Sequence, residues 1–393
     1  MTTASSGNCY GDGDRDLIIL CQFAVVSGYR SFFEHLARIN PARRIHLVVP
    51  AQFTELGNQT VPCEPLRAEA PDNLVMTVLT CFAPHVQIMI LPGLVGFFRV
   101  RKKDTATLPP LLIAMVEPYS VSFLWMWLCL RLSGLRAEIW GFTCQNIFKP
   151  FRWPLSAIQQ LCFRTAPRIL ACGIEQQQVL RQQGFLGAIM FFPFWYDESR
   201  LKLDGDNQRV ASQPFNIGFC GKIAVEKGVF DIVDALRLGA VELRGHVRLC
   251  IAGGGPDRPR LEESLGALAA EGFEVEDSGA LAFERIPEFF AKLDVLLVPS
   301  RTQHNWKEQF GRVIVEAMAC GVTVLGSDSG EIPHVIGDPD RVFREADPIA
   351  LADCLKKTLF ERSFTRSENS QRALVHYSSA ATARALAQEI AGT

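Results

Sequence analysis

One stretch, residues 297–333, limits what this chain can fold into more than any other: LVPSRTQHNWKEQFGRVIVEAMACGVTVLGSDSGEIP. It reads as the end of a strand, a polar loop, a short helix, a second strand and a Gly-rich turn. The apolar run Leu293–Pro299 is typical of a buried strand, and proline closes it. Gly311 opens the helical pattern, Gly321 stands where a helix stops, and Val322–Leu325 resumes a strand. This order of elements predicts part of an α/β domain.

Two carboxylates in this stretch indicate a binding site. Glu308 lies in the loop before the helix, and Glu316 lies on the helix inside an otherwise apolar run, where an unpaired charge is costly. Taken alone, Glu316 would face solvent or pair with a structural lysine or arginine. The junction of loop and helix, however, follows the carboxyl end of a strand, which is where open α/β sheets bind ligands.

The start of the helix is suited to a phosphate group. A helix N-terminus offers free N–H groups and a partial positive charge. Here the free amides belong to Phe310, Gly311, Arg312 and Val313. Glu308 before this terminus and Glu316 beyond it could hold hydroxyl groups on either side of a diphosphate, as a sugar and a ribose require.

The segment EQFGRVIVEAMACG, followed by SDSGEIP, resembles the donor-site motif of retaining GT-B glycosyltransferases of glycosyltransferase family 4. Glu308 and Glu316 are the two glutamates of its E-x(7)-E pair. The resemblance implies a GT-B fold, in which two Rossmann-like α/β domains with parallel sheets face a central cleft. It implies that Glu308 contacts the donor sugar, that Glu316 contacts the ribose, and that the amides at the helix start hold the sugar and phosphate.

The resemblance extends to a Gly-rich loop at the start of the second domain. The segment FNIGFCGKIAVEKGV, residues 215–229, reads as a strand followed by a loop that contains Gly221, Lys222 and Lys227. In the family an arginine and a lysine at this spacing neutralise the donor diphosphate. Here Lys222 stands in the place of the arginine, so a point charge replaces a bidentate fork. Taken alone, the two lysines would be exposed residues of a turn.

Two further segments of the second domain match the family in outline. The GGGP turn at residues 253–256 resembles a glycine turn near the donor and includes Gly254 and Gly255, although a bare glycine turn is weak evidence. Leu281 follows Ser278-Gly279-Ala280, where family members frame the base with main-chain groups.

The first domain matches the family only in outline. Leu17–Val26 reads as a buried strand followed by a turn at Gly28, and no G-x-G-x-x-G fingerprint is present. The resemblance places Gly28 at the cleft, whereas a lone turn glycine is more often structural. Val86–Leu91 and Leu111–Val116 also read as buried strands.

Glu117 and Tyr119 follow the strand Leu111–Val116. Many relatives carry a histidine near this place that reaches the donor sugar, and this chain has none there, so Glu117 or Tyr119 stands at that position on the sugar or acceptor side. The alternative for Glu117 is an acid at a helix N-terminus, which the helix dipole stabilises.

The length of 393 residues suits two α/β domains. We expect residues 1–195 to form the acceptor-side domain, 196–214 a linker and 215–375 the donor-binding domain. A C-terminal helix, 376–393, is expected to pack back on the first domain, as in GT-B relatives.

Composition excludes several classes of protein. The formal net charge of −2 gives no general attraction to nucleic acid. Twelve cysteines are scattered without a C-x-x-C pair, which indicates reduced thiols and no zinc site. The first 16 residues, MTTASSGNCYGDGDRD, lack the basic and apolar regions of a signal peptide, so we read them as a flexible leader and expect a cytoplasmic protein.

Two segments combine apolar and basic residues. The segment at 122–136 falls short of the ~20 apolar residues of a membrane span and is interpreted as a core helix. For 91–103, Phe97 and Phe98 with four nearby cations suggest a loop that could rest on an anionic membrane or grip a lipid-linked acceptor. The cations are Arg99, Arg101, Lys102 and Lys103.

The resemblance implies a retaining glycosyltransferase that moves a sugar from a UDP- or GDP-sugar to a glycan or lipid-linked acceptor, with no cofactor. Two fixed lysines remove the need for a metal ion at the leaving group. The D-x-D spellings at 204–206 and 338–340 are interpreted as surface turns. The alternatives are a nucleotide-sugar-binding protein without transfer activity, an epimerase, or a phosphorylase.

Overall fold

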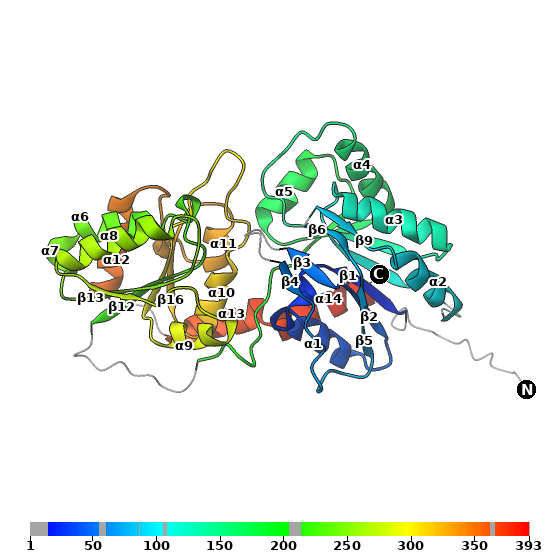
Figure 1. The fold of residues 1–393 in the computed structure, drawn as a ribbon, viewed down its shortest axis with the longest axis horizontal. Coiled ribbons are helices and arrows are strands. Elements are labelled where there is room, and N and C mark those ends of the chain that lie inside the picture. The colour runs from blue at the N-terminus through cyan, green and yellow to red at the C-terminus, as the bar shows by residue number, and fades with distance from the viewer. Residues whose placement is uncertain are drawn as a thin grey trace, which may run out of the picture.

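The computed structural model shows two α/β domains, each with a parallel sheet between layers of helices (Figure 1). The structure describes residues 15–54, 60–85, 87–104, 108–203, 214–361 and 366–392. The D-x-D segment at 204–206 lies outside these residues, as does most of the expected leader. The other D-x-D segment is a turn, in which a carboxylate oxygen of Asp338 accepts from the amide of Asp340 at 3.1 Å, as expected.

The sheet of the first domain has seven strands in the order β11-β10-β9-β8-β1-β2-β5, all parallel. Its central strands are apolar runs because helices cover both of their faces. The order reverses between β1 and β8, where parallel sheets open a crevice at their carboxyl ends. The strands are β1 Leu17–Cys21, β2 Ile45–Pro50, β5 Leu74–Leu79, β8 Leu111–Met115, β9 Glu138–Thr143, β10 Arg168–Ala171 and β11 Ala188–Phe191.

Helices and two small antiparallel pairs complete the first domain. The prediction of a buried strand at Val86–Leu91 is wrong. The strand found there, β7 (Ile88–Ile90), lies outside the main sheet and pairs antiparallel with β6 (Phe82–His85). β3 (Gln52–Thr54) and β4 (Thr60–Pro62) form the other pair. The α-helices are α1 Ser31–Ile39, α2 Leu94–Asp104, α3 Val121–Ser133, α4 Leu155–Thr165 and α5 Ile174–Gln182.

The basic segment at 91–103 forms most of helix α2, with its two aromatic side chains turned inward. Phe97 and Phe98 are buried and pack in the same core cluster as α3. The expectation that these rings rest on a membrane is therefore wrong, although Arg99, Lys102 and Lys103 are exposed. Among the described residues, no helix combines the length and apolar character that crossing a membrane requires. The core-helix interpretation of 122–136 agrees with α3, which contributes to this cluster.

The sheet of the second domain has six parallel strands in the order β14-β13-β12-β15-β16-β17. Its order reverses between β12 and β15, which again marks the ligand-binding edge of such a sheet. The strands are β12 Phe215–Cys220, β13 Val247–Ala252, β14 Glu274–Asp277, β15 Val295–Val298, β16 Thr323–Ser327 and β17 Val342–Phe343. The remaining α-helices of the chain are α6 Val229–Leu238, α7 Ala240–Leu243, α8 Arg258–Ala270, α9 Ile286–Ala291, α10 Arg312–Ala319, α11 Ile332–Ile336, α12 Pro348–Glu361, α13 Arg366–Tyr377 and α14 Ser379–Ala391.

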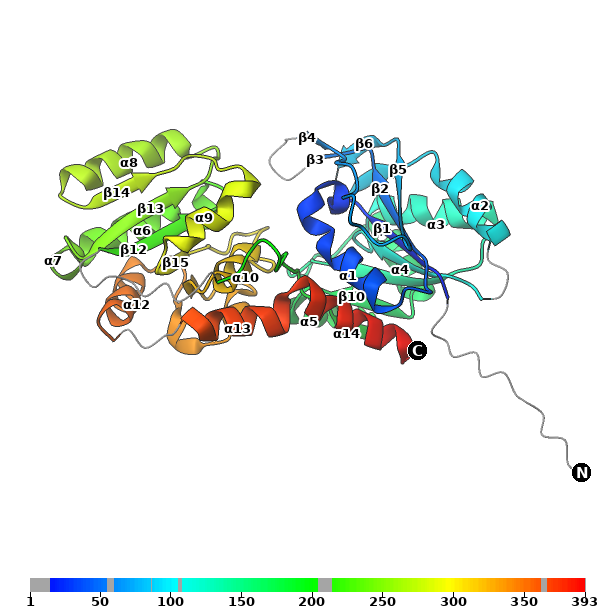
Figure 2. The same ribbon diagram turned by 90° about the horizontal axis from the view of Figure 1, so that it is seen from below.

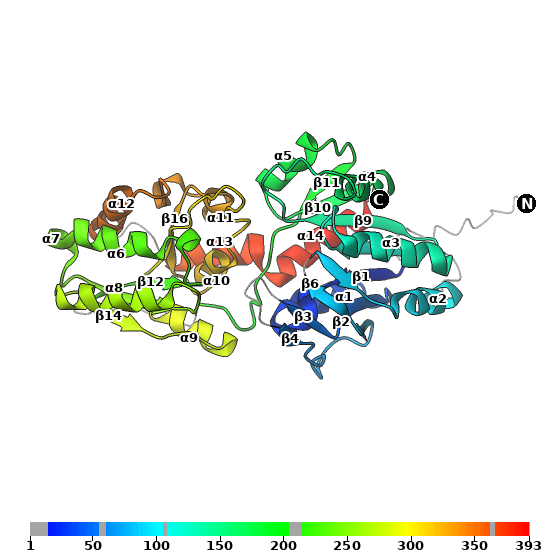
Figure 3. The same cartoon turned by 45° about the horizontal axis from the view of Figure 1, so that its top comes forward.

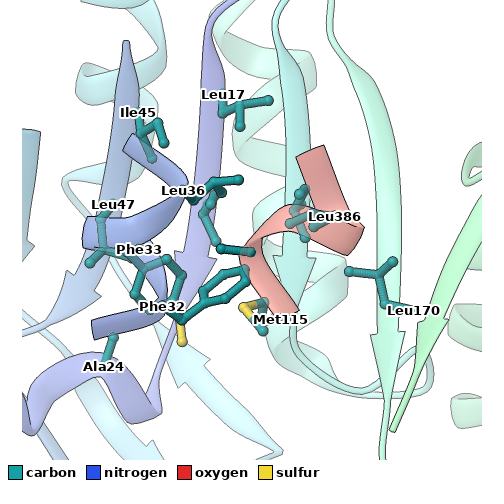
Figure 4. Packing of buried hydrophobic residues seen from close by; sticks show 14 of the residues in the cluster. Leu17, Ala24, Phe32, Phe33, Leu36, Ile45, Leu47, Met115, Leu170 and Leu386 are labelled. Atoms are coloured by element: carbon teal, nitrogen blue, oxygen red, sulfur yellow. The ribbon is translucent and has the colours of Figure 1, made fainter. Parts of the chain in front are cut away.

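The chain returns to the first domain at its end. Helix α13 lies along the second domain, and α14 continues onto the first, where it packs on α1 (Figure 2). Ser379 and Ser31 share a hydrogen bond of 2.5 Å between their hydroxyl groups. Leu386 of α14 enters the core of the first domain beside Met115 and Leu36 (Figure 4). The two domains are thus joined by α14 as well as by the segment between their sheets.

The eleven cysteines among the described residues are free thiols, and eight of them are buried. Burial in apolar surroundings raises the pKa of several of these thiols, including Cys129 to about 11 and Cys250 to about 11. Such thiols are protonated and unreactive at neutral pH, so they act as small apolar side chains.

Candidate active site

A pocket of about 160 Å³ lies at the carboxyl ends of β12 and β15, against the start of α10. This is the switch point of the second sheet, so the topology and the pocket agree. Seven of the residues selected from the sequence line it: Gly221, Lys222, Lys227, Glu308, Gly311, Arg312 and Val313. The other lining residues are Phe219, Cys220, Leu297, Val298 and Ser300.

Glu308 is held in this pocket by two partners. The Lys227 Nζ donates to its Oε2 at 2.7 Å, and the Ser300 Oγ donates to the same oxygen at 2.9 Å. Glu308 is 8% exposed, and the Lys227 ammonium also lies 4.7 Å from the centre of the Trp306 ring. Sequence reasoning missed Ser300 and Trp306. An apolar strand that ends in Pro-Ser at the ligand edge is the signal that could have indicated Ser300.

Lys222 lines the same pocket but is held less firmly. Its Nζ lies 3.1 Å from the Glu226 carboxylate, and its side chain is 43% exposed. An exposed ion pair of this kind contributes little to stability. Of the two predicted cations, Lys227 is therefore the fixed one.

Glu316 is buried on α10 and paired within its own helix. The Arg312 Nη2 donates to its Oε1 at 2.7 Å. Burial raises the pKa of Glu316 above the usual range, and the Arg312 guanidinium offsets part of this rise. Arg312 also stacks on the Tyr29 ring of the first domain at 4.1 Å, so α10 contacts the turn after β1. The sequence had marked the turn but not Tyr29.

The start of α10 has the form expected of an anion site. Gly311 precedes the helix with a φ of 76°, a conformation that glycine adopts without strain, and no side chain caps the first turn. Phe310 is different, because its ring is 2% exposed and packs edge-on against Phe194 and Tyr377. Only the main chain of Phe310 can therefore serve a ligand.

The glycine turn after β13 packs on the loop that carries the lysines. A Cβ atom at Gly253 would overlap the carbonyl of Gly221, and one at Gly255 would overlap the main chain of Ile223. A Cβ atom at Gly254 would make only an ordinary van der Waals contact with Ala280. Gly254, Gly255 and Leu281 do not line the pocket described above, so a role for them in donor binding stays a prediction.

Gly28 approaches the second domain closely. A Cβ atom there would lie 2.5 Å from the ring of Phe283, which follows β14. Gly28 therefore lies at the domain interface, as the resemblance implied, and its lack of a side chain is required by packing there.

Glu117 and Tyr119 lie at the carboxyl end of β8 and bond to the end of β9 and the residues that follow it. The Glu117 carboxylate accepts from the Thr143 hydroxyl at 2.7 Å and from the Cys144 amide at 2.9 Å. The alternative that Glu117 is an acid of a helix N-terminus is wrong, because Ser120 caps α3 and its first turn holds no acidic residue. Burial raises the pKa of Glu117 to about 7.

Tyr119 is buried rather than presented to a ligand. Its hydroxyl donates to the Gln145 side chain at 3.1 Å, and its ring stacks on Phe151 at 4.2 Å. Neither Tyr119 nor Glu117 lines the pocket around Glu308. Their contact with a sugar or an acceptor stays a prediction.

The loop before α10 is bonded to the first domain, which the sequence did not indicate. Asn146 donates to the carbonyl of Glu308 at 2.9 Å, and Lys307 pairs with Glu175 at 2.5 Å. Helix α5 lies on the side of the first domain that faces α11 of the second domain (Figure 3). Within the described ranges, no three His, Cys, Asp or Glu side chains gather in a way that could hold a metal ion.

Comparison with known proteins identifies the second domain. Residues 214–360 match the family model described as glycosyl transferases group 1. The second domain belongs to the group 1 glycosyl transferases. The two glutamates of the E-x(7)-E pair lie within these matched residues, Glu308 in the pocket and Glu316 on α10.

Curated relatives match about a third of the chain. The D-inositol 3-phosphate glycosyltransferase of Xylanimonas cellulosilytica is 34% identical over 143 residues, or 35% of this chain and 32% of that protein. A GDP-mannose-dependent α-(1-6)-phosphatidylinositol dimannoside mannosyltransferase of Mycobacterium tuberculosis is 28% identical over 138 residues, or 35% of this chain and 33% of that protein. The chain thus matches about a third of the length of these relatives.

Solved structures match nearly the whole chain and establish its fold. Sucrose-phosphate synthase from Thermosynechococcus elongatus has a TM-score of 0.68 at 16% identity, covering 95% of this chain and 98% of that one. HepE of Anabaena in complex with UDP-glucose has a TM-score of 0.66 at 17% identity, covering 96% of this chain and 100% of that one. The group 1 domain and the N-terminal domain together form a GT-B fold, as expected.

Proposed function

We propose that this chain is a retaining glycosyltransferase that moves a sugar from a UDP- or GDP-sugar to a glycan or lipid-linked acceptor, without a metal ion or other cofactor. The observation that carries the proposal is the pocket in which Lys227 and Glu308 meet beside the uncapped start of α10. A cation, a carboxylate and free helix amides in one pocket suit a diphosphate that is linked to a hydroxyl-rich sugar.

The leaving group is the part of the donor that this pocket suits best. When the bond between the anomeric carbon and the diphosphate oxygen breaks, negative charge develops on that oxygen. Lys227, Lys222 and the start of α10 would stabilise this charge. The acceptor oxygen would bond to the anomeric carbon on the same face, and its proton would pass to the leaving phosphate.

Glu308 is proposed to bind a hydroxyl group of the sugar rather than to attack the anomeric carbon. Its Oε2 already accepts from the Lys227 ammonium and from the Ser300 hydroxyl. These bonds stabilise the carboxylate as an acceptor and reduce its strength as a nucleophile. Glu316, with Arg312 beside it, is proposed to bind the ribose.

The relatives suggest which donors to test first. The structural neighbour HepE binds UDP-glucose in its crystal, and the Mycobacterium tuberculosis relative is named as GDP-mannose-dependent. Both nucleotide classes therefore remain candidates for this chain. The name of the Mycobacterium tuberculosis relative also contains phosphatidylinositol dimannoside, which supports including lipid-linked acceptors in the test.

A membrane surface is the proposed source of a lipid-linked acceptor. The exposed cations Arg99, Lys102 and Lys103 on α2 support electrostatic contact with an anionic inner leaflet. With Phe97 and Phe98 buried, this contact would rest on charge alone, and it would make the chain a peripheral protein of the cytoplasmic face.

Nucleotide release tests the proposal. The purified chain is incubated with UDP-glucose or GDP-mannose, with and without lipid-linked and glycan acceptors, in the presence of a chelator. We expect acceptor-dependent release of one nucleoside diphosphate and an axial anomeric linkage in the product by NMR. Donor binding without release would instead identify a binding protein, conversion of the donor without acceptor would identify an epimerase, and a requirement for free phosphate would identify a phosphorylase.

A further inference from the structure

Three consecutive residues at the active-site loop are each bonded to the first domain. Lys307 pairs with the Glu175 carboxylate at 2.5 Å, and the Glu308 carbonyl accepts from the Asn146 side chain at 2.9 Å. The Gln309 carbonyl accepts from the Gln176 side chain at 2.8 Å. The residue whose carboxylate lies in the donor pocket is thus fixed through its own main chain and through both of its neighbours.

A buried carboxylate of the second domain completes this contact. Glu331 is 1% exposed, and its Oε1 accepts from the Glu175 amide in the first turn of α5 at 2.5 Å. A carboxylate at a helix N-terminus satisfies a free N–H group and interacts favourably with the helix dipole. Burial raises the pKa of Glu331, and the main-chain amides of Glu175 and Ile174 oppose this rise.

Two glycines, Gly173 and Gly330, allow Glu331 and its neighbours to pack closely. A Cβ atom at Gly173, the residue before α5, would lie 2.3 Å from both the carboxyl carbon of Glu331 and the Oε1 atom of Gln176. The Glu331 amide also donates to the Glu308 carbonyl at 3.1 Å, and a Cβ atom at Gly330, where φ is 57°, would overlap that carbonyl. Glu331 therefore contacts α5 with its side chain and Glu308 with its main chain.

We propose that Glu331 is a positioning residue for the transfer reaction, which sets the Glu308 carboxylate by docking the loop 307–309 on the first turn of α5. Gly173 is the matching position of the first domain, since only a residue without a side chain admits Glu331. This inference rests on the proposed function, because it assumes that Glu308 contacts the donor sugar. It predicts that the sugar is oriented by the domain contact while the nucleotide is bound by the second domain alone.

Four variants test the inference, with UDP and GDP as binding probes and UDP-glucose and GDP-mannose as donors. Gly173→Ala and Glu331→Ala should lower kcat by about tenfold or more, since a misplacement of about 1 Å at a reacting group costs up to about 100-fold. Their affinity for the nucleoside diphosphate that binds the wild type, measured by calorimetry, should change by less than about twofold, because neither Gly173 nor Glu331 lines the pocket that holds it. Glu331→Gln, which keeps an acceptor oxygen, should recover part of the lost rate.

Glu198→Gln is the matched control. The Glu198 carboxylate accepts from the amides of Ser379 and Ala380 at the start of α14, both at 3.0 Å, so it caps a helix on the first domain away from the pocket. It should lower the melting temperature but leave kcat close to that of the wild type. If kcat in Gly173→Ala and Glu331→Ala were unchanged, or fell only as much as nucleotide affinity did, the positioning role would be overturned.

Failure of the proposed function would be distinct from failure of this inference. A wild-type protein that released no nucleotide from either donor would contradict the function alone. The positioning role is then read from crystal structures of Gly173→Ala and Glu331→Ala. The contact between Lys227 Nζ and Glu308 Oε2, 2.7 Å in the wild type, should open beyond about 4 Å, the limit of an ion pair. An unchanged contact in both variants would overturn the inference.

Discussion

Three glutamates, of which Glu316 and Glu331 are buried and Glu117 is partly buried, have raised pKa values. Burial raises the pKa of Glu117, Glu316 and Glu331 alike. The compensating groups differ, because Arg312 opposes the rise at Glu316 while main-chain amides oppose it at Glu331. At Glu117 a threonine hydroxyl and an amide oppose it, and the pKa reaches about 7. Glu117 therefore changes its charge near neutral pH.

The shift at Glu117 predicts a pH dependence of stability. The folded state binds this proton more tightly than the unfolded chain does, whose glutamate pKa is about 4.5, so the stabilisation is complete below pH 4.5 and is lost as the pH rises towards 7. Between pH 5 and pH 8 the free energy of unfolding of the wild type should fall, relative to Glu117→Gln, by on the order of 1–3 kcal/mol. Urea denaturation of both proteins at the two pH values measures this. If the free energies of unfolding of the wild type and Glu117→Gln differed by the same amount at both pH values, the Glu117 carboxyl would not titrate in this range.

At the scale of single elements, the sequence predicted α10 and its flanking strands well and α2 poorly. Around α10 an apolar strand, two glycines and a helical apolar face all agree, so the position of the helix start and of Glu308 followed from local pattern. In helix α2 the apolar and basic residues are not separated onto two faces by the sequence pattern. Packing on α3 determines which face of α2 is buried. Local pattern could not show that Phe97 and Phe98 turn towards that helix.

The burial of α2 predicts the effect of a core substitution. Phe98 is 0% exposed, so Phe98→Ala should lower the free energy of unfolding by about 3–5 kcal/mol. Val100 on the same helix is 50% exposed, and Val100→Ala should change it by less than about 0.5 kcal/mol. Chemical denaturation of the two variants measures the difference. If Phe98→Ala kept full stability but lost binding to anionic vesicles, the membrane interpretation of this ring would be restored.

At the scale of the molecule, the pocket around Glu308 belongs to the second domain, while the loop that carries Glu308 is held by both domains. The pocket residues are contributed by neighbouring segments of one domain, which is why the sequence could predict Lys227 and Glu308 together. The contact between Glu175 and Glu331 joins residues 156 positions apart and has no local pattern. Asn146 and Gln176 were missed for the same reason, since only the docking of the two domains gives these side chains their partners.

The most direct test of the account is calorimetric binding of UDP, GDP and their sugars in the presence of a chelator, with the wild type, Lys227→Met and Lys222→Met. One nucleotide class should bind the wild type without metal. Lys227→Met should weaken this binding by about 10- to 100-fold, because a hydrogen bond to a charged group contributes about 1.5–3 kcal/mol. Lys222→Met should weaken it less, since Lys222 is partly exposed and already paired with Glu226. Failure of every nucleotide to bind, or binding that Lys227→Met leaves unchanged, would contradict the assignment of this pocket as the donor site.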